Sequence, residues 1–207
     1  MSNKTHCLLI GFSCTGKTSL GEKVFGKNIL DSDDELLKWI CEKKHEYFKH
    51  IYEIYMKLGR DPAISLIKEA EEALITKWAH DTTRKVISLG PGFPLHNNWA
   101  CLRKISYVIL FRSSPQSIYD HMKGRREKTF KCCPEAEKID NWDIGVMRDN
   151  DRMFSKEEAV SHIQNLLCER ENKYRDNDAE IVTDCALRKL IELARAFQDG
   201  STEDRIN

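Results

Sequence analysis

The chain has 207 residues, of which 41% are hydrophobic and 32% are charged, and its 33 basic residues balance its 33 acidic ones. This size and composition are typical of a globular protein with an α/β core, and the zero net charge gives no indication of a nucleic-acid partner. No apolar run reaches the length of a membrane span and no signal-peptide pattern precedes the first motif, so we expect a cytoplasmic protein without a membrane partner.

The first motif is Gly11–Thr18, whose sequence GFSCTGKT fits the phosphate-binding loop (P-loop) pattern G-x-x-x-x-G-K-T. The apolar run His6–Ile10 before it suits a buried parallel strand, and Ser19–Phe25 after it suits a helix. Lys17 would reach the terminal phosphates of ATP, and the Thr18 hydroxyl would bind Mg²⁺. The alternative is a glycine turn followed by an ordinary surface lysine. Because backbone N–H groups of such a loop bind phosphate, we expect ATP to contact Ser13, Cys14, Thr15, Gly16, Lys17, Thr18 and Ser19.

Three aspartates follow the next predicted strand. Residues 27–30 form a short strand candidate that leads into Asp31, Asp33 and Asp34. The carboxyl ends of parallel strands lie at one edge of a sheet, where α/β proteins bind ligands. We therefore expect Asp31 to hold the magnesium through water and Asp33 to take the proton from an attacking hydroxyl. The alternative is that Asp33 and Asp34 cap a helix that starts near Glu35.

The middle of the chain is predicted to be mainly helical. From Glu35 to His80 the apolar spacing favours helix almost throughout, with a break at residues 59–62 and a long helix over residues 63–79. Residues 84–89 then predict a buried strand, which ends at Gly90-Pro91-Gly92. A glycine pair at the carboxyl end of a strand lets a ligand approach the backbone closely. The alternative is a plain turn between strand and helix.

Residues 105–111 form the clearest strand of the sequence, and a helix opens at Pro115. Arg125 and Arg126 follow in a basic cluster, and residues 127–155 show little periodicity. We expect this loop-like segment to be a mobile lid over about residues 124–155. The alternative for the two arginines is a solvated basic surface.

The last part of the chain continues the alternation of helix and strand. Residues 155–158 have capping-box spacing and predict the start of a helix, residues 179–183 a short strand, and residues 187–197 a closing helix. This order predicts a three-layer α/β/α fold with a parallel sheet. We expect one domain over residues 1–199 and a frayed tail over residues 200–207.

Four segments resemble the shikimate kinase family of P-loop kinases, and they occur in the family's order. They are Gly11–Thr18, Asp31-Ser32-Asp33, Ile87–Gly92, and Glu169-Arg170 with Tyr174 followed by residues 179–182. The resemblance spans most of the chain and implies the P-loop fold of that family, with a mobile lid. It also implies an acceptor site in which Asp33 holds the ring hydroxyls of the substrate, Gly90 and Gly92 lie beside the ring, and Arg170 binds the carboxylate.

On the ATP side, the resemblance implies that Asp31 serves the magnesium and that Arg125 or Arg126 closes over the phosphates. We assign catalytic roles to Lys17, Asp33 and Arg126. Lys17, Mg²⁺ and the lid arginine would neutralise the developing charge while Asp33 orients the acceptor hydroxyl.

The departures from the family pattern all affect the acceptor side. Ile64 stands where the family has its second substrate arginine, the triple glycine has become Gly90-Pro91-Gly92, and the lid lacks the family's R-P-L-L. Losing one charged partner of a carboxylate can cost about 2–5 kcal/mol. We therefore expect weak or absent phosphorylation of shikimate, unless Arg60 reaches the site as a substitute.

The sequence predicts an ATP-dependent kinase that transfers the γ-phosphate to a hydroxyl of shikimate or a related hydroxylated acid. A gluconate-type or nucleoside monophosphate-type kinase shares the loop and is an alternative within the same class. A degenerate kinase fold that binds nucleotide as a regulatory module is the alternative from another class. We expect a small-molecule acceptor as the partner, no nucleic acid, and a monomer or a dimer.

Overall fold

The computed structural model describes residues 4–26, 29–132, 148–149, 152–182 and 186–198. The chain divides into two compact units. The first, called here the sheet unit, comprises residues 1–35, 72–113 and 173–207; the second, called the helical unit, comprises residues 36–71 and 114–172. Three helices begin in one unit and end in the other, namely α2 (Ser32–Lys44), α4 (Arg60–His80) and α7 (Lys156–Tyr174).

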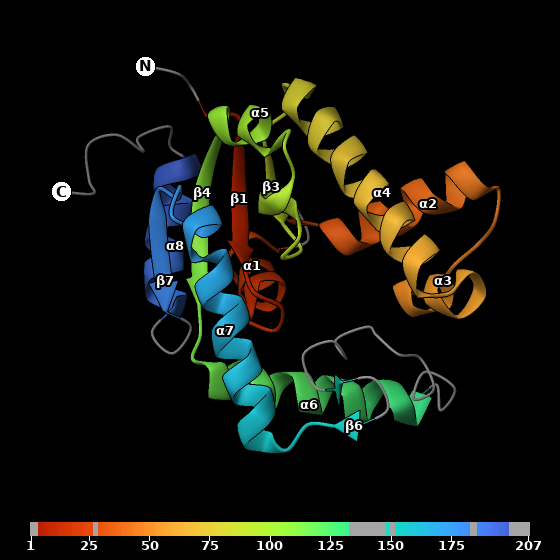
Figure 1. Cartoon of the computed structure of the whole chain (residues 1–207). Coiled ribbons are helices and arrows are strands. Elements are labelled where there is room, and N and C mark those ends of the chain that lie inside the picture. The colour runs from red at the N-terminus through yellow and green to blue at the C-terminus, as the bar shows by residue number, and fades with distance from the viewer. Residues whose placement is uncertain (1–3, 27–28, 133–147, 150–151, 183–185, 199–207) are drawn as a thin grey trace. The chain divides into compact units, whose positions relative to one another are not determined.

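The sheet unit is built on five parallel strands in the order β2-β3-β1-β4-β7. Their bounds are β1 (His6–Gly11), β2 (Ile29–Asp31), β3 (Lys85–Ser88), β4 (Ser106–Arg112) and β7 (Ala179–Val182). Figure 1 shows β1 in red between β3 and β4, where Leu9 pairs with Ser88 on one side and with Ile109 on the other. The predicted parallel α/β sheet is thus confirmed.

One face of the sheet packs against helices α1 (Lys17–Phe25) and α8 (Ala186–Gln198). Cys7 and Leu9 of β1 point to this face because alternate residues of a strand face the same side. They join buried side chains from β4, β7 and the two helices in one apolar cluster: Phe25, Tyr107, Ile109, Phe111, Ile181, Leu190, Leu193 and Phe197. This cluster holds α1 and α8 against β1.

The opposite face of β1 carries His6, Leu8 and Ile10, all fully buried. The His6 ring nitrogen Nε2 lies 2.9 Å from the carbonyl oxygen of Trp78 in the last turns of α4. The Trp78 ring stacks on Phe93 with 5.8 Å between ring centroids. Phe93 begins the 3₁₀ turn Phe93–Leu95, which is followed by helix α5 (Trp99–Lys104). These contacts anchor the chain that follows Gly90-Pro91-Gly92.

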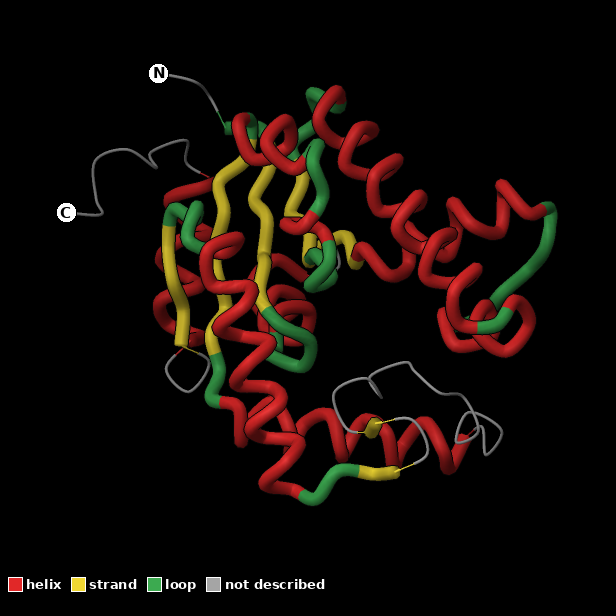
Figure 2. Tube along the Cα trace, viewed as in Figure 1, coloured by secondary structure: helices red, strands yellow, loops and turns green. Residues whose placement is uncertain are grey.

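The helical unit contains α3 (Ile51–Leu58), α6 (Pro115–Cys132) and the parts of α2, α4 and α7 that fall within its bounds. Within its described residues, the unit also contains a short antiparallel pair of strands, β5 (Arg148–Asp149) and β6 (Arg152–Met153). Figure 2 shows helices in red and strands in yellow, and helix predominates in this unit. The predicted capping box is present, because Ser155 N–H donates to Glu158 Oε2 and Glu158 N–H donates to Ser155 Oγ.

The predicted start of the second helix is wrong, and the difference has a local cause. Helix α2 begins at Ser32 rather than near Glu35, because Asp31 Oδ1 accepts the N–H of Asp33 at 2.9 Å. Asp31 therefore caps the first turn, and Asp33 and Asp34 lie inside it. The stretch predicted to be helical from Glu35 to His80 has a further interruption at residues 45–50, between α2 and α3, besides the break near residue 59.

The predicted loop over residues 127–155 is wrong at its start. Helix α6 continues to Cys132, and the Lys, Arg and Glu residues near its end favour helix without an apolar stripe. Residues 133–147 and 150–151, where most of the predicted lid falls, and the predicted tail over residues 200–207 lie outside the described residues. The lid stays a prediction.

Candidate active site

The P-loop joins β1 to α1 and depends on two glycines. Gly11 has φ +141°, and a Cβ there would lie 2.5 Å from the backbone oxygen of Phe111 on the neighbouring strand. Gly16 has φ +83° just before α1. Both positions require glycine, the first because of the close approach and the second because of the left-handed backbone. Thr15 Oγ1 donates to the carbonyl of Phe12 at 2.9 Å and closes the loop on itself.

The other predicted ATP contacts in this segment have different exposures. Ser13 and Cys14 are partly exposed at the outer turn of the loop, and Cys14 has the left-handed φ of +60°. Ser19 is exposed in the first turn of α1. Contact of these residues with ATP stays a prediction, which their position at the helix start favours.

Lys17 is 8% exposed, and its ammonium group donates to the carbonyls of Gly11 at 3.0 Å and Phe12 at 2.8 Å. The predicted contact of Lys17 with the terminal phosphates of ATP stays a prediction. The charge of Lys17 lies over the loop backbone, so its removal affects the loop as well as a bound phosphate. A charge at this place favours an anion in the loop.

Three oxygen-bearing side chains meet at the carboxyl ends of β2 and β3 and the start of α1. Thr18 Oγ1 donates to Asp31 Oδ2 at 2.8 Å and lies 2.9 Å from Ser88 Oγ. Because the single hydroxyl proton of Thr18 goes to Asp31, Ser88 is the donor in the second bond. We call Thr18, Asp31 and Ser88 the oxygen cluster. Two hydroxyls and a carboxylate are the hard oxygen donors that Mg²⁺ prefers, so the residues fit the predicted ion.

Asp33 lies beside the turn that follows β3. A Cβ at Gly90 would be 3.6 Å from Asp33 Oδ1, an ordinary van der Waals distance. Gly90 N–H donates to Ser32 Oγ at 2.8 Å, and the Tyr174 hydroxyl donates to the carbonyl of Pro91 at 3.2 Å. The structure therefore brings Asp33 together with the predicted glycine turn, which ends at Gly92.

The three predicted arginines belong to the helical unit. Arg125 and Arg126 lie in α6, where Arg125 is exposed and Arg126 is partly buried, and Arg170 is partly buried in α7. The P-loop and Asp33 belong to the sheet unit. A common site for these arginines with ATP or with the acceptor stays a prediction.

Sequence reasoning missed three residues of this site. Ser88 is 2% exposed in an otherwise apolar strand, and a lone serine next to the end of such a strand was the available signal. Ser32 is fully buried and holds Gly90. Tyr174 was noted in the resemblance but was given no role.

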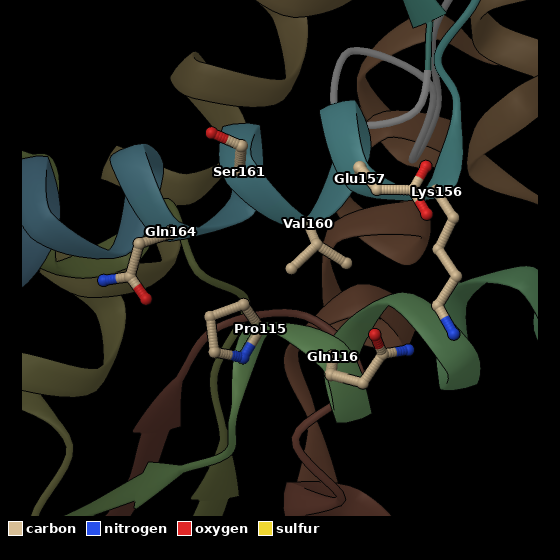
Figure 3. A pocket seen from close by; sticks show the side chains of 7 residues that line it. All are labelled: Pro115, Gln116, Lys156, Glu157, Val160, Ser161 and Gln164. Atoms are coloured by element: carbon tan, nitrogen blue, oxygen red, sulfur yellow. The ribbon is translucent and has the colours of Figure 1, made fainter.

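An open groove lies within the helical unit, away from the predicted site residues. It has a volume of about 450 Å³ and lies between the first turns of α6 and α7. Figure 3 shows Val160 of α7 pointing toward Pro115 and Gln116 of α6, with Lys156 at one side. None of the residues predicted to bind ATP, magnesium or acceptor lines this groove.

The chain is similar in sequence to a shikimate kinase of Thermodesulfovibrio yellowstonii, with 32% identity over 122 residues. The match covers 57% of this chain and 64% of the length of that relative, so just under two thirds of it. No family model matches the chain. Within the described residues, no helix has the length and apolar character that crossing a bilayer requires.

Solved structures of shikimate kinases superpose on nearly the whole chain. The enzyme from Acinetobacter baumannii, solved in complex with shikimate, has a TM-score of 0.62 at 16% identity and covers 100% of this chain and 97% of its own. The fold is that of a shikimate kinase. The enzyme from Bacteroides thetaiotaomicron has a TM-score of 0.58 at 15% identity, covering 92% of this chain and 98% of its own. The resemblance seen in the sequence motifs is thus borne out in the fold.

Proposed function

We propose that this shikimate kinase-like chain is an ATP-dependent phosphotransferase that moves the γ-phosphate of ATP to a hydroxyl of shikimate or a related hydroxylated acid. The observation that carries the proposal is the oxygen cluster. Its hydrogen bonds of 2.8 and 2.9 Å join the P-loop to the ends of β2 and β3, the edge at which parallel α/β sheets bind ligands.

On the nucleotide side, the backbone of the P-loop binds phosphate and Lys17 adds a positive charge. Thr18 and Asp31 would hold Mg²⁺, and Ser88 is hydrogen-bonded to the Thr18 hydroxyl. The ion would supply charge neutralisation on the transferring phosphoryl group. Arg126, or Arg125 beside it in α6, supplies a further positive charge from the lid over about residues 124–155.

On the acceptor side, Asp33 accepts the proton of the attacking hydroxyl and binds a neighbouring hydroxyl group of the acceptor. Gly90 supports this role because a Cβ there would lie 3.6 Å from Asp33 Oδ1, so a glycine at this position lets an acceptor approach that carboxylate closely. Arg170 binds the anionic group of the acceptor. The complex of the Acinetobacter baumannii enzyme with shikimate supports a small hydroxylated acid as the acceptor class.

The test is ADP release with Mg²⁺-ATP and a panel of acceptors: shikimate and other hydroxylated acids, sugars, and nucleoside monophosphates. We expect turnover with a hydroxylated acid and its loss in Lys17→Ala. Lys23→Ala is the matched control, because Lys23 is an exposed lysine on the same helix. Turnover only with a sugar or a nucleotide would show that the acceptor belongs to that class and is not a hydroxylated acid. Nucleotide binding without any turnover would favour the alternative of a nucleotide-binding regulatory module.

A further inference from the structure

The turn Gly90-Pro91-Gly92 is tied through two backbone groups to side chains that are distant in sequence. Ser32 Oγ accepts the N–H of Gly90 at 2.8 Å, and the Tyr174 hydroxyl donates to the carbonyl of Pro91 at 3.2 Å. The turn borders Asp33, because a Cβ at Gly90 would lie 3.6 Å from Asp33 Oδ1. The backbone conformation of the turn therefore decides the shape of the space beside Asp33.

A turn with two glycines has high backbone freedom unless other groups restrain it. Pro91 has no N–H, so its carbonyl is the backbone group of that residue that can form a hydrogen bond. The Tyr174 hydroxyl forms this bond from a side chain that is 3% exposed. A buried donor with a fixed ring is a more rigid restraint than an exposed one, because it does not exchange its partner for water.

Tyr174 is itself held in place by the segment that follows it. Asn177 Nδ2 donates to the carbonyl of Tyr174 at 2.9 Å. Asp178 then pairs with Val108 of β4, because its Oδ2 accepts the Val108 N–H at 2.7 Å and its own N–H donates to the Val108 carbonyl at 2.8 Å. The end of α7 is thus fixed to the central part of the sheet.

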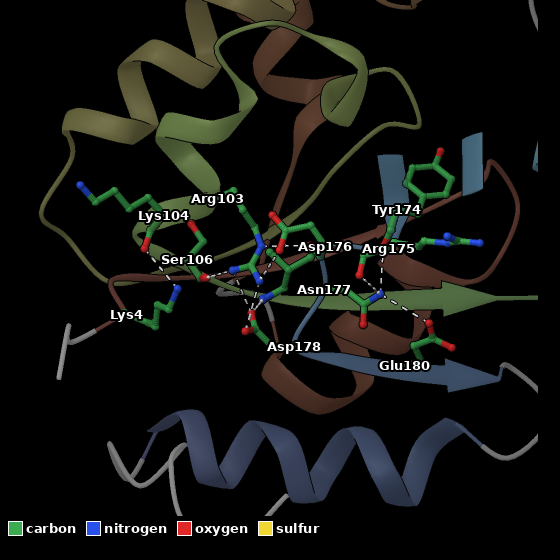
Figure 4. A network of polar contacts seen from close by, with 11 residues as sticks. Lys4, Arg103, Lys104, Ser106, Tyr174, Arg175, Asp176, Asn177, Asp178 and Glu180 are labelled. Atoms are coloured by element: carbon green, nitrogen blue, oxygen red, sulfur yellow. Dashed lines mark hydrogen bonds and ion pairs between the residues drawn. The ribbon is translucent and has the colours of Figure 1, made fainter. Parts of the chain in front are cut away.

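Arg103, at the end of α5, adds a second anchor for the same segment. Its Nε donates to the carbonyl of Asp176 at 2.9 Å, and its Nη1 donates to the carbonyl of Ser106 at 3.1 Å and lies 3.2 Å from Asp178 Oδ2. Figure 4 shows this network, with the Tyr174 ring projecting away from it. The network therefore holds the backbone of residues 174–178 and leaves the Tyr174 hydroxyl to reach the Pro91 carbonyl.

We propose that Tyr174 is a positioning residue for the acceptor. The hydrogen bonds of Arg103, Asn177 and Asp178 hold the backbone at Tyr174, and the Tyr174 hydroxyl in turn restrains the glycine turn beside Asp33. This inference rests on the proposed function. Tyr174 does not take part in the chemistry, and it acts through the Pro91 carbonyl. Its loss affects binding of the acceptor and leaves binding of ATP unchanged, because the P-loop lies on another segment of the sheet unit.

The test compares Tyr174→Phe with Tyr107→Phe. Tyr107 is the matched control because its hydroxyl is also buried but has no hydrogen-bond partner among the residues that the structure describes. We expect Tyr174→Phe to raise KM for the acceptor about fivefold to tenfold, the effect of losing one hydrogen bond, with KM for ATP unchanged. Tyr107→Phe should change neither KM. A purely structural role for Tyr174 would lower the melting temperature without separating the two KM values.

Amide hydrogen exchange provides a second measurement that does not need turnover. The amides of Phe93 and Leu95 donate to the carbonyls of Gly90 and Gly92, so they report on the turn. We expect Tyr174→Phe to speed their exchange and Tyr107→Phe to leave it unchanged. If the wild type phosphorylates no acceptor, the proposed function fails, and faster exchange at the turn still supports the restraint by Tyr174. Unchanged exchange, or an unchanged acceptor KM in an active enzyme, overturns the inference.

Discussion

Replacing Thr18 by Val tests the oxygen cluster directly. Val has nearly the shape of Thr but lacks the hydroxyl, so the P-loop keeps its packing while Asp31 and Ser88 lose their common partner. Thr18 is partly buried, and the bond that it donates to Asp31 at 2.8 Å ends on a carboxylate. Hydrogen bonds to charged groups contribute about 1.5–3 kcal/mol, and bonds between neutral groups contribute about 1 kcal/mol.

The loss of the charged bond corresponds to a fall of about 10- to 150-fold in kcat/KM for Mg²⁺-ATP. We expect the same variant to need more Mg²⁺ for half-maximal activity, because in the proposed site the hydroxyl is one of the oxygens that would hold the ion. The free energy of unfolding should fall by only about 1–2 kcal/mol, because the site is partly open to water. Thr18→Ser keeps the hydroxyl and should stay within a few-fold of the wild type.

The assay is steady-state ADP release over a range of Mg²⁺ concentrations, with urea unfolding measured on the same preparations. A Val variant that keeps the wild-type kcat/KM at limiting Mg²⁺ would refute the assignment of the oxygen cluster to the ion. A variant that loses stability but keeps its turnover would show that the cluster only joins α1 to β2 and β3.

Two further predictions concern Gly90 in the glycine turn and the buried side chain of Tyr107. Gly90→Ala should fold normally, because the added Cβ meets its neighbours at 3.6 Å or more. Its kcat/KM for the acceptor should fall while KM for ATP stays constant, since the methyl group would lie beside Asp33. A wild-type value of kcat/KM for the acceptor would contradict the proposed placement of the acceptor. Burial raises the pKa of Tyr107 to about 12, so the stability that its neutral form supports is complete below about pH 10 and is lost as the pH rises toward 12. Urea unfolding at pH 8 and 11 should therefore show that Tyr107→Phe loses about 1 kcal/mol less than the wild type over this interval, whereas equal losses would contradict the shift.

The parts of the site that lie close together in sequence could be predicted, because local patterns determine them. Gly11 and Gly16 mark the P-loop, and the alternation of apolar runs and helical stripes indicates the parallel sheet. Asp31 is the last residue of β2 and Asp33 lies two residues further on, so their place at the carboxyl edge follows from strand order alone.

Contacts between distant segments could not be predicted in the same way. The bond between Thr18 and Ser88 depends on the register of β3 against β1, and the bond between Tyr174 and Pro91 depends on how α7 ends against the sheet. The position of Lys17 over the loop carbonyls depends on side-chain rotamers that no spacing rule contains. Helix α6 extends past the predicted start of the lid, in a segment whose helix-favouring residues form no apolar stripe.

The last prediction concerns the acceptor and α4, where Ile64 stands in place of the arginine that the family resemblance implies. Ile64 and Ile67 are both partly exposed, so that position offers apolar surface rather than a charge for a carboxylate. Arg60, the proposed substitute, is the exposed first residue of α4. Burial and the charge of Glu71 raise the pKa of Tyr55, and the charge of Arg60 opposes this rise, which indicates that Arg60 lies near Tyr55.

Ile64→Arg should therefore raise kcat/KM for shikimate by at least about tenfold, mainly through a lower KM, because a second charged partner for a carboxylate is worth about 2–5 kcal/mol when buried and less when partly exposed. The long stem of arginine can lie along α4 with its head in water, so the variant should fold. Ile67→Arg is the matched control, since it places the same charge one helical turn away and should leave kcat/KM unchanged. A wild type that already phosphorylates shikimate at about 10⁴ M⁻¹s⁻¹ or more would show that the missing arginine is irrelevant. A gain in Ile64→Arg alone would show that the natural acceptor is a hydroxylated compound other than shikimate, because the P-loop, the oxygen cluster and Asp33 are unchanged in that variant.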